Sequence, residues 1–206
     1  MANKSLAKSP TELTILVTGG AGFIGSHTCV ELLAKGFNVV IVDDLSNSSE
    51  IAVERVRKIA GVGADRCAFH EANVLDRDAM EAIFSEHDID AIIHFAGFKA
   101  VGESVQKPLE YYWNNIAGTL VLCDVARNHG VKNIVFSSSA TVYGEPEFVP
   151  ITEDCPKHSA TNPYGQTKTM LEQVLTDLYV GDNEWYVVQL RYFNPIGAHE
   201  SGLIGE

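Results

Sequence analysis

Tyr164 and Lys168 are two residues whose types and spacing suggest proton-transfer chemistry. They follow Pro163, a residue favoured at the first position of a helix, and a spacing of four places the phenol and the ammonium on one helical face. A free tyrosine would need its pKa lowered by about 3, or roughly 4 kcal/mol, to act as a base at neutral pH. An ammonium about 5 Å away supplies roughly 3 kcal/mol at an effective dielectric constant of about 20. The pair therefore predicts a tyrosine base, provided that a further positive charge lies nearby.

A run of serines, Ser137-Ser138-Ser139, precedes this pair at the end of a predicted strand. The carboxyl ends of parallel strands form the edge at which α/β proteins bind ligands. A hydroxyl at Ser139 could bridge a substrate oxygen and the tyrosine, whereas turn capping is the simpler interpretation of Ser137 and Ser138. Because Tyr-x-x-x-Lys also arises by chance in helices, the serine run is what favours Ser139, Tyr164 and Lys168 as a catalytic set acting on a hydroxyl-bearing substrate.

A glycine-rich turn is the second chemical signal, and it reads Thr18-Gly19-Gly20-Ala21-Gly22-Phe23-Ile24-Gly25. It satisfies both G-x-G-x-x-G and G-x-x-G-x-x-G, between a predicted strand and a predicted helix. Glycines let the backbone approach a pyrophosphate, and the helix N-terminus supplies N–H donors. Asp43 ends the next predicted strand, where a carboxylate that binds the adenosine ribose is expected. With Asp44 beside it and no Arg or Lys before Arg55, the site is predicted to bind NAD in preference to NADP.

Alternating strands and helices must position these residues. The pattern predicts an α/β fold with a doubly wound, mostly parallel sheet of the Rossmann type. The segment 145–162 lacks periodicity and contains three prolines, so we expect it to form a wall of the site. We expect a flexible segment over 1–12, the dinucleotide-binding domain over 13–198 and the start of a substrate region over 199–206. The predicted strands are 14–18, 38–42, 66–71, 91–95, 133–137 and 185–191, and the predicted helices are 23–35, 50–59, 76–86, 109–128 and 163–179.

Composition narrows the class of protein. The chain has 206 residues and a net charge of -12, which disfavours nucleic acid and anionic membranes as partners. No apolar run is long enough for a membrane span, and the N-terminus has no signal-type pattern. The four cysteines and seven histidines show no metal-ligand spacing, so no metal site is predicted. A cytoplasmic protein with reduced cysteines is expected.

The motifs together resemble the extended short-chain dehydrogenase/reductase superfamily. Within it, the similarity is greatest to the UDP-glucose 4-epimerase family, and it runs from about Leu13 to the last residue. The stretches that carry it are Gly19–Cys29, Phe95–Pro108, Ser137–Gly144 and Arg191–His199. The resemblance implies an NAD-dependent interconversion of UDP-glucose and UDP-galactose in galactose metabolism, and a homodimer in the full-length form.

The resemblance also implies a role for residues along the cofactor path. The substrate would be bound by Lys99, Ser139, Tyr164 and Asn194. The cofactor residues implied are Gly19, Gly22, Phe23, Ile24, Gly25, Asp43, Asp44, Leu45, Ser46, Asn47, Ser48, Asn73, Val74, Phe95, Ala96, Gly97, Phe98, Lys99, Asn114, Tyr164, Lys168 and Phe193.

Two positions depart from the family pattern. Asn73 stands where the family usually has an acid beside the adenine, which predicts a weakened cofactor site that keeps a carbonyl acceptor. Trp113 stands where a small polar residue is common, and the sequence indicates no effect of this difference on the site.

The sequence leaves three interpretations of the function open. Nucleotide-sugar 4,6-dehydratases also resemble the chain, but they need a carboxylate just after the serine, where this chain has Ala140 and Thr141. The family continues beyond Glu206 by about another 100 to 150 residues, so the sequence is expected to be C-terminally truncated and inactive by itself. The alternatives to an epimerase are therefore a catalytically silent NAD-binding fragment or another nucleotide-sugar enzyme such as a dehydratase.

Overall fold

A computed structural model describes residues 8–158 and 160–206 of the chain. Short turns of 3-10 helix lie at Pro10–Glu12 (η2) and Ala140–Tyr143 (η4), and a π-helical turn at Trp113–Ala117 (η3). The strands are β1 (Thr14–Thr18), β2 (Asn38–Asp43), β3 (Cys67–Glu71), β4 (Ala91–His94), β5 (Asn133–Ser139) and β6 (Tyr186–Tyr192). The helices are α1 (Phe23–Ala34), α2 (Glu50–Ala60), α3 (Arg77–Glu86), α4 (Val101–Gln106), α5 (Pro108–Tyr112), α6 (Gly118–Asn128) and α7 (Pro163–Gly181).

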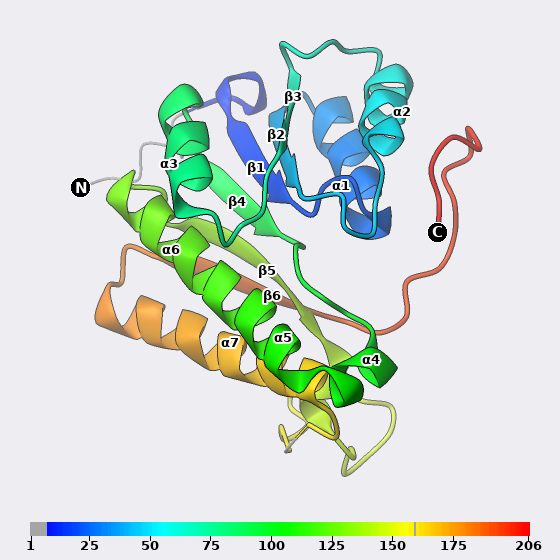
Figure 1. Cartoon of the computed structure of the whole chain (residues 1–206), viewed down its shortest axis with the longest axis vertical. Helices are drawn as coiled ribbons and strands as arrows, with labels where there is room; N and C mark the ends of the chain where they lie inside the picture. The colour runs from blue at the N-terminus through cyan, green and yellow to red at the C-terminus, as the bar shows by residue number, and fades with distance from the viewer. Residues whose placement is uncertain (1–7, 159) are drawn as a thin grey trace.

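The strands form one six-stranded parallel sheet in the order β3-β2-β1-β4-β5-β6 (Figure 1). The chain winds outward from β1 to β3 and then returns to build β4 to β6 on the other side of β1. This arrangement confirms the predicted doubly wound α/β fold. The winding reverses between β1 and β4, and in such sheets the crevice beyond the carboxyl ends at this point is where ligands bind.

Alternating residues of the strands divide the core into two layers. Leu16, Val40 and Val42 face one side of the sheet, where they pack with α3, α6 and α7 (Figure 1). Ile15 and Val17 face the other side, where α1 and α2 cover them. Because both faces of the central strands are buried, their sequences are continuously apolar rather than alternating.

The β6 strand has one uncovered face among the described residues. Tyr186, Val188 and Leu190 alternate along it, and each is more than a third exposed. They lie at the edge of the sheet, on the side away from the α3, α6 and α7 layer, into which their neighbour Val187 packs.

The helices differ from the prediction in two places. The helix expected over 109–128 contains the π-helical turn η3, and α4 precedes it without having been predicted. The β5 strand extends to Ser139, so the serine run lies in the sheet itself. The flexible segment expected over 1–12 is described only from residue 8, where Lys8 pairs with Asp90 at 2.6 Å. Across the described residues, no helix has the length and apolar character needed to cross a membrane.

Candidate functional site

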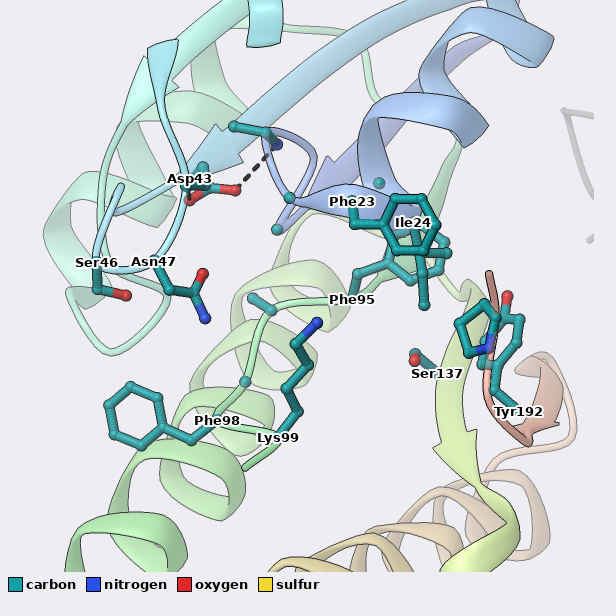
Figure 2. A pocket seen from close by; sticks show the side chains of 18 of the residues that line it. Phe23, Ile24, Asp43, Ser46, Asn47, Phe95, Phe98, Lys99, Ser137 and Tyr192 are labelled. Atoms are coloured by element: carbon teal, nitrogen blue, oxygen red, sulfur yellow. Dashed lines mark hydrogen bonds between the residues drawn. The ribbon is translucent and has the colours of Figure 1, made fainter. Parts of the chain in front are cut away.

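A cavity of about 830 Å³ lies at the carboxyl edge of the sheet, within the range of about 300 to 1,000 Å³ typical of small-molecule sites. Figure 2 shows Asp43, Ser46 and Asn47 at one end and Ser137 and Tyr192 at the other. Every predicted catalytic and substrate-binding residue lines this cavity, and so does every predicted cofactor residue except Leu45. The fold therefore brings the glycine turn and the Ser139, Tyr164 and Lys168 set to one hollow.

Leu45 is the exception, because it does not line the cavity, and its contact with the cofactor stays a prediction. Its backbone is left-handed, with φ of 56°, and its side chain packs against the core layer under α1 and α2. Its N–H donates to the Asp43 carboxylate at 3.1 Å. Leu45 therefore supports the loop after β2 from its core side. A family pattern that covers a whole range of residues does not separate such a supporting residue from those that line the cavity.

The glycine turn is too closely packed to carry side chains at two of its positions. A methyl group on Gly25 would lie 2.2 Å from the Gly19 carbonyl oxygen, and one on Gly19, with φ of +68°, would lie 2.7 Å from the Ala96 nitrogen. Helix α1 begins directly after Gly22, which is its N-cap. The first N–H groups of a helix lack intrahelical partners, so this end of α1 offers donors to a phosphate.

Asp43 is buried and already holds three hydrogen bonds. Its carboxylate accepts from the Ala21 N–H at 3.0 Å, the Leu45 N–H at 3.1 Å and the Ser48 hydroxyl at 2.7 Å (Figure 2 shows the first). A carboxylate can accept about four hydrogen bonds. One acceptor position therefore remains for a ligand hydroxyl, and the same carboxylate ties the glycine turn to the loop after β2.

Asn73 takes part in a contact that the sequence did not reveal. Its amide nitrogen donates to the Asp44 carboxylate at 2.8 Å, and its amide oxygen accepts from the Leu75 N–H at 2.9 Å. Both Asp44 and Asn73 line the cavity. Asn73 thus pairs with Asp44, whereas an acid at position 73 would face a second carboxylate.

Lys168 is buried behind Tyr164 at the other end of the cavity. Its ammonium donates to the Ser137 carbonyl at 2.7 Å and lies 4.8 Å from the centre of the Phe136 ring and 5.9 Å from that of the Tyr164 ring. An ammonium has three donors, so two remain after the bond to Ser137. Burial lowers the pKa of Lys168 to about 8.

The tyrosine is not activated by this pair alone. Burial raises the pKa of Tyr164, and the Ser139 hydroxyl, which acts in the opposite direction, offsets this only in part. The loss of solvent around the phenol, rather than the ammonium expected from the sequence, is the dominant influence on this pKa. A tyrosinate at this position therefore needs another positive charge at the site.

The Ser139 oxygen accepts hydrogen bonds from Thr141, and its own O–H is directed away from that residue. Its hydroxyl oxygen accepts from the Thr141 N–H at 3.2 Å and from the Thr141 hydroxyl at 3.0 Å. With two acceptor positions occupied, the Ser139 O–H is left to donate to the phenol oxygen or to a ligand. This geometry suits a hydroxyl that relays a proton.

Sequence reasoning missed a buried ion cluster behind the site. Glu172 is fully buried on α7 and accepts from the Ser138 hydroxyl at 2.6 Å, Lys157 at 3.1 Å and Arg191 at 2.9 Å. Burial alone would raise the pKa of Glu172, but these partners, Arg191 first, lower it. Ser138 therefore does not cap a turn. The cluster fastens the ends of β5 and β6 to α7, and an acid four residues after Lys168 was its only sequence signal.

Comparisons with known proteins agree on one family. Residues 15–205 match the NAD dependent epimerase/dehydratase family. A UDP-glucose 4-epimerase of Bacillus subtilis is 62% identical over 194 residues, which are 94% of this chain and 56% of the relative. A UDP-glucose 4-epimerase 2 of Arabidopsis thaliana is 57% identical over 193 residues, 94% of this chain and 55% of the relative. The chain thus spans about half the length of the curated relatives it matches.

Solved structures extend the same result to three dimensions. A UDP-glucose 4-epimerase from Bifidobacterium longum, in complex with NAD+ and UDP, superposes with a TM-score of 0.91 at 56% identity, covering 94% of this chain and 57% of that one. The enzyme from Stenotrophomonas maltophila, with bound NAD and a formylated UDP-arabinopyranose, gives a TM-score of 0.90 at 48% identity, covering 95% and 57%.

Proposed function

The chain belongs to the NAD dependent epimerase/dehydratase family, and we propose that it forms the cofactor-binding portion of an enzyme that interconverts UDP-glucose and UDP-galactose. One observation carries the proposal: the glycine turn, Asp43, and the Ser139, Tyr164 and Lys168 set all line a single cavity. The closely packed glycine turn and the open end of α1 fit a dinucleotide, with its adenosine ribose at Asp43.

The residues at the other end of the cavity divide the proton chemistry among them. When bound, NAD would supply the hydride chemistry at C4 of the hexose, which inverts that carbon once the 4-keto sugar has rotated. Tyr164 removes the proton of the C4 hydroxyl and later returns it, with the Ser139 O–H bridging the phenol and the sugar oxygen. Lys168 keeps two donors for the nicotinamide ribose and adds positive charge beside the phenol.

The stretch between Ser139 and Tyr164 disfavours a dehydratase. Elimination of water needs a carboxylate that moves a proton beside the serine. In the part of the chain that the structure describes, the carboxylates lining the cavity are Asp43, Asp44 and Glu206, and none lies between Ser139 and Tyr164. An epimerase needs no such group, because its hydride and proton return to the same sugar carbon and oxygen.

The experiment uses a fusion of residues 1–206 to the carboxyl-terminal part of the Bacillus subtilis relative that the chain does not match. We expect it to convert UDP-galactose to UDP-glucose with no net consumption of NAD. Formation of a 4-keto-6-deoxy sugar would favour the dehydratase, and retained NAD binding without turnover would favour a silent binding module.

The NAD preference gives a direct test of Asp43. A ribose 2′-phosphate beside Asp43 and Asp44 meets like charge, so the chain should bind NAD at least about tenfold more tightly than NADP in calorimetric titrations. Asp43→Ala should narrow that ratio, because one of the repelling carboxylates is gone. The control is Asp65→Ala, an exposed acid outside the cavity, which should leave the ratio unchanged. Equal or tighter NADP binding by the unaltered chain would contradict the assignment.

The Asn73–Asp44 contact predicts that restoring the family's acid weakens cofactor binding. Asn73→Asp replaces a 2.8 Å hydrogen bond by two facing carboxylates, at a cost of about 1 kcal/mol for an exposed pair, or roughly fivefold in NAD affinity. The exchange variant with both Asn73→Asp and Asp44→Asn re-forms an amide–carboxylate pair and should recover the loss. Tighter NAD binding by Asn73→Asp alone would show that the acid acts on the adenine instead.

An apolar stripe on the described residues supports the expected homodimer. Leu109, Trp113 and Leu120 recur at spacings of four and seven along the helical stretch from α5 to α6, and each is at least 45% exposed. A second copy of the same stripe would bury them against one another. In light scattering of the fusion protein, Leu109→Lys should shift the mass from dimer to monomer, whereas Ile51→Lys on exposed α2 should not. A monomeric unaltered fusion would contradict the assignment.

A further inference from the structure

Two histidines and a glutamate gather on the outer side of β3, away from the cavity. His70 lies on β3, Glu86 ends α3, and His87 follows it directly. The Nε2 atoms of the two imidazoles are 2.8 Å apart, and a Glu86 carboxylate oxygen lies 3.9 Å from Nε2 of His87. All three potential ligand atoms lie within 4.8 Å of one another. Residues separated by 16 positions in the sequence therefore converge at one point.

The facing nitrogens are unusual for a simple polar contact. Each neutral imidazole has one N–H and one lone pair, so the pair forms a single hydrogen bond only if the two rings adopt different tautomers. The rings meet edge to face, with centroids 5.0 Å apart and an interplanar angle of 74°. The two Nε2 atoms are therefore the closest points of the two rings that the contact brings together.

We propose that His70, His87 and Glu86 bind a divalent transition-metal ion of the zinc class, with water completing a four-coordinate site. Zinc takes imidazole nitrogen at about 2.0 to 2.1 Å and carboxylate oxygen at about 2.0 to 2.2 Å, which places tetrahedral ligand atoms about 3.3 Å apart. The separations of 2.8 and 3.9 Å lie on either side of that value and the third is at most 4.8 Å, so side-chain rotations would bring the three ligand atoms to one ion. The two imidazoles favour zinc over magnesium or calcium, which prefer oxygen ligands.

The surroundings leave these ligands available. The side chain of His87 is 20% exposed and that of Glu86 is 65% exposed, so an ion reaches the cluster from solvent. Imidazole binds a metal ion in its neutral form, through a ring nitrogen, so zinc binding at this cluster should strengthen as the pH rises. Burial raises the pKa values of the Cys29, Cys67 and Cys123 thiols, so these protonated groups do not compete for the ion.

The role of this ion is structural. None of the three ligands lines the cavity, so the ion takes no part in the proton relay. It joins the end of β3 to the end of α3, and the segment between these two elements carries Asn73 and Val74. An ion that binds the folded chain and not the unfolded one raises the free energy of unfolding by mass action.

The test measures zinc binding and thermal unfolding on the 206-residue chain after treatment with a chelator. The unaltered chain should bind one equivalent of Zn²⁺, unfold at a higher temperature with zinc than without, and give the visible absorption of tetrahedral cobalt with Co²⁺. His70→Gln and His87→Gln should each weaken zinc binding at least about tenfold, consistent with the loss of a ligand. Without metal, both variants should unfold cooperatively, as the unaltered chain does.

A matched control separates this cluster from ordinary surface histidines. His129 pairs with Glu81 of α3 at 2.7 Å, and neither residue belongs to the cluster, so His129→Gln removes a histidine–carboxylate pair while keeping all three proposed ligands. It should leave zinc affinity unchanged. Equal zinc binding by the unaltered chain and the double variant with His70→Gln and His87→Gln would overturn the proposal. So would an equal loss of affinity in His129→Gln, because zinc would then bind adventitiously.

Discussion

Replacing Tyr164 by phenylalanine should lower epimerisation by the fusion protein at least about a thousandfold, a loss of roughly 4 kcal/mol in transition-state stabilisation. The substitution removes only the phenolic oxygen, so NAD should remain bound. Tyr179 provides a matched control, because it lies on the same helix and is exposed, and Tyr179→Phe should be near normal. Turnover and NAD titration on all three proteins check the result.

Replacing Lys168 distinguishes the role of the lysine from that of Tyr164. Lys168→Ala removes the ammonium that contacts Ser137 and lies behind the phenol, so it should weaken both turnover and NAD binding. Phenylalanine at 164 should affect turnover alone. Near-normal epimerisation by Tyr164→Phe across neutral pH would mean that another group is the base.

The 206-residue chain by itself should epimerise UDP-galactose at least about a thousandfold less efficiently than the fusion protein, again roughly 4 kcal/mol. The cavity contains the proposed cofactor contacts, but Lys99, Ser139, Tyr164 and Asn194 are the only substrate contacts assigned on this chain. Its net charge of -12 also opposes an anionic UDP-sugar. Phe193 and Ile196 are 60% and 86% exposed at the mouth, so water reaches the reaction centre.

The uncovered face of β6 adds a second readout to this comparison. Tyr186, Val188 and Leu190 leave an apolar strip on an edge strand, which favours self-association. Size-exclusion chromatography of the 206-residue chain should show larger species as its concentration rises. A coupled assay for UDP-glucose on both lengths decides the main question, and comparable rates would show that the substrate site has been misplaced.

Most strands and helices, and the edge of the sheet at which the site forms, were predictable from the sequence. The apolar runs of β1 and β2, the glycine turn between β1 and α1, and the Pro163 start of α7 are local patterns, each readable from neighbouring residues. The parallel α/β arrangement then places the carboxyl ends of the strands together. Asp43, Ser139 and Tyr164 could therefore be assigned to one edge of a sheet without coordinates.

How these residues act on one another depends on the tertiary structure. Burial and contacts between distant segments determine four features of this protein. They are the raised pKa of Tyr164, the packing of Leu45 against the core, the ion cluster of Glu172 and the approach of His70 to His87. Periodicity and spacing are properties of a short stretch of chain and say on which face a side chain lies. Which side chain lies opposite it, and how much water the two exclude, is set by the register and packing of elements far apart in the sequence.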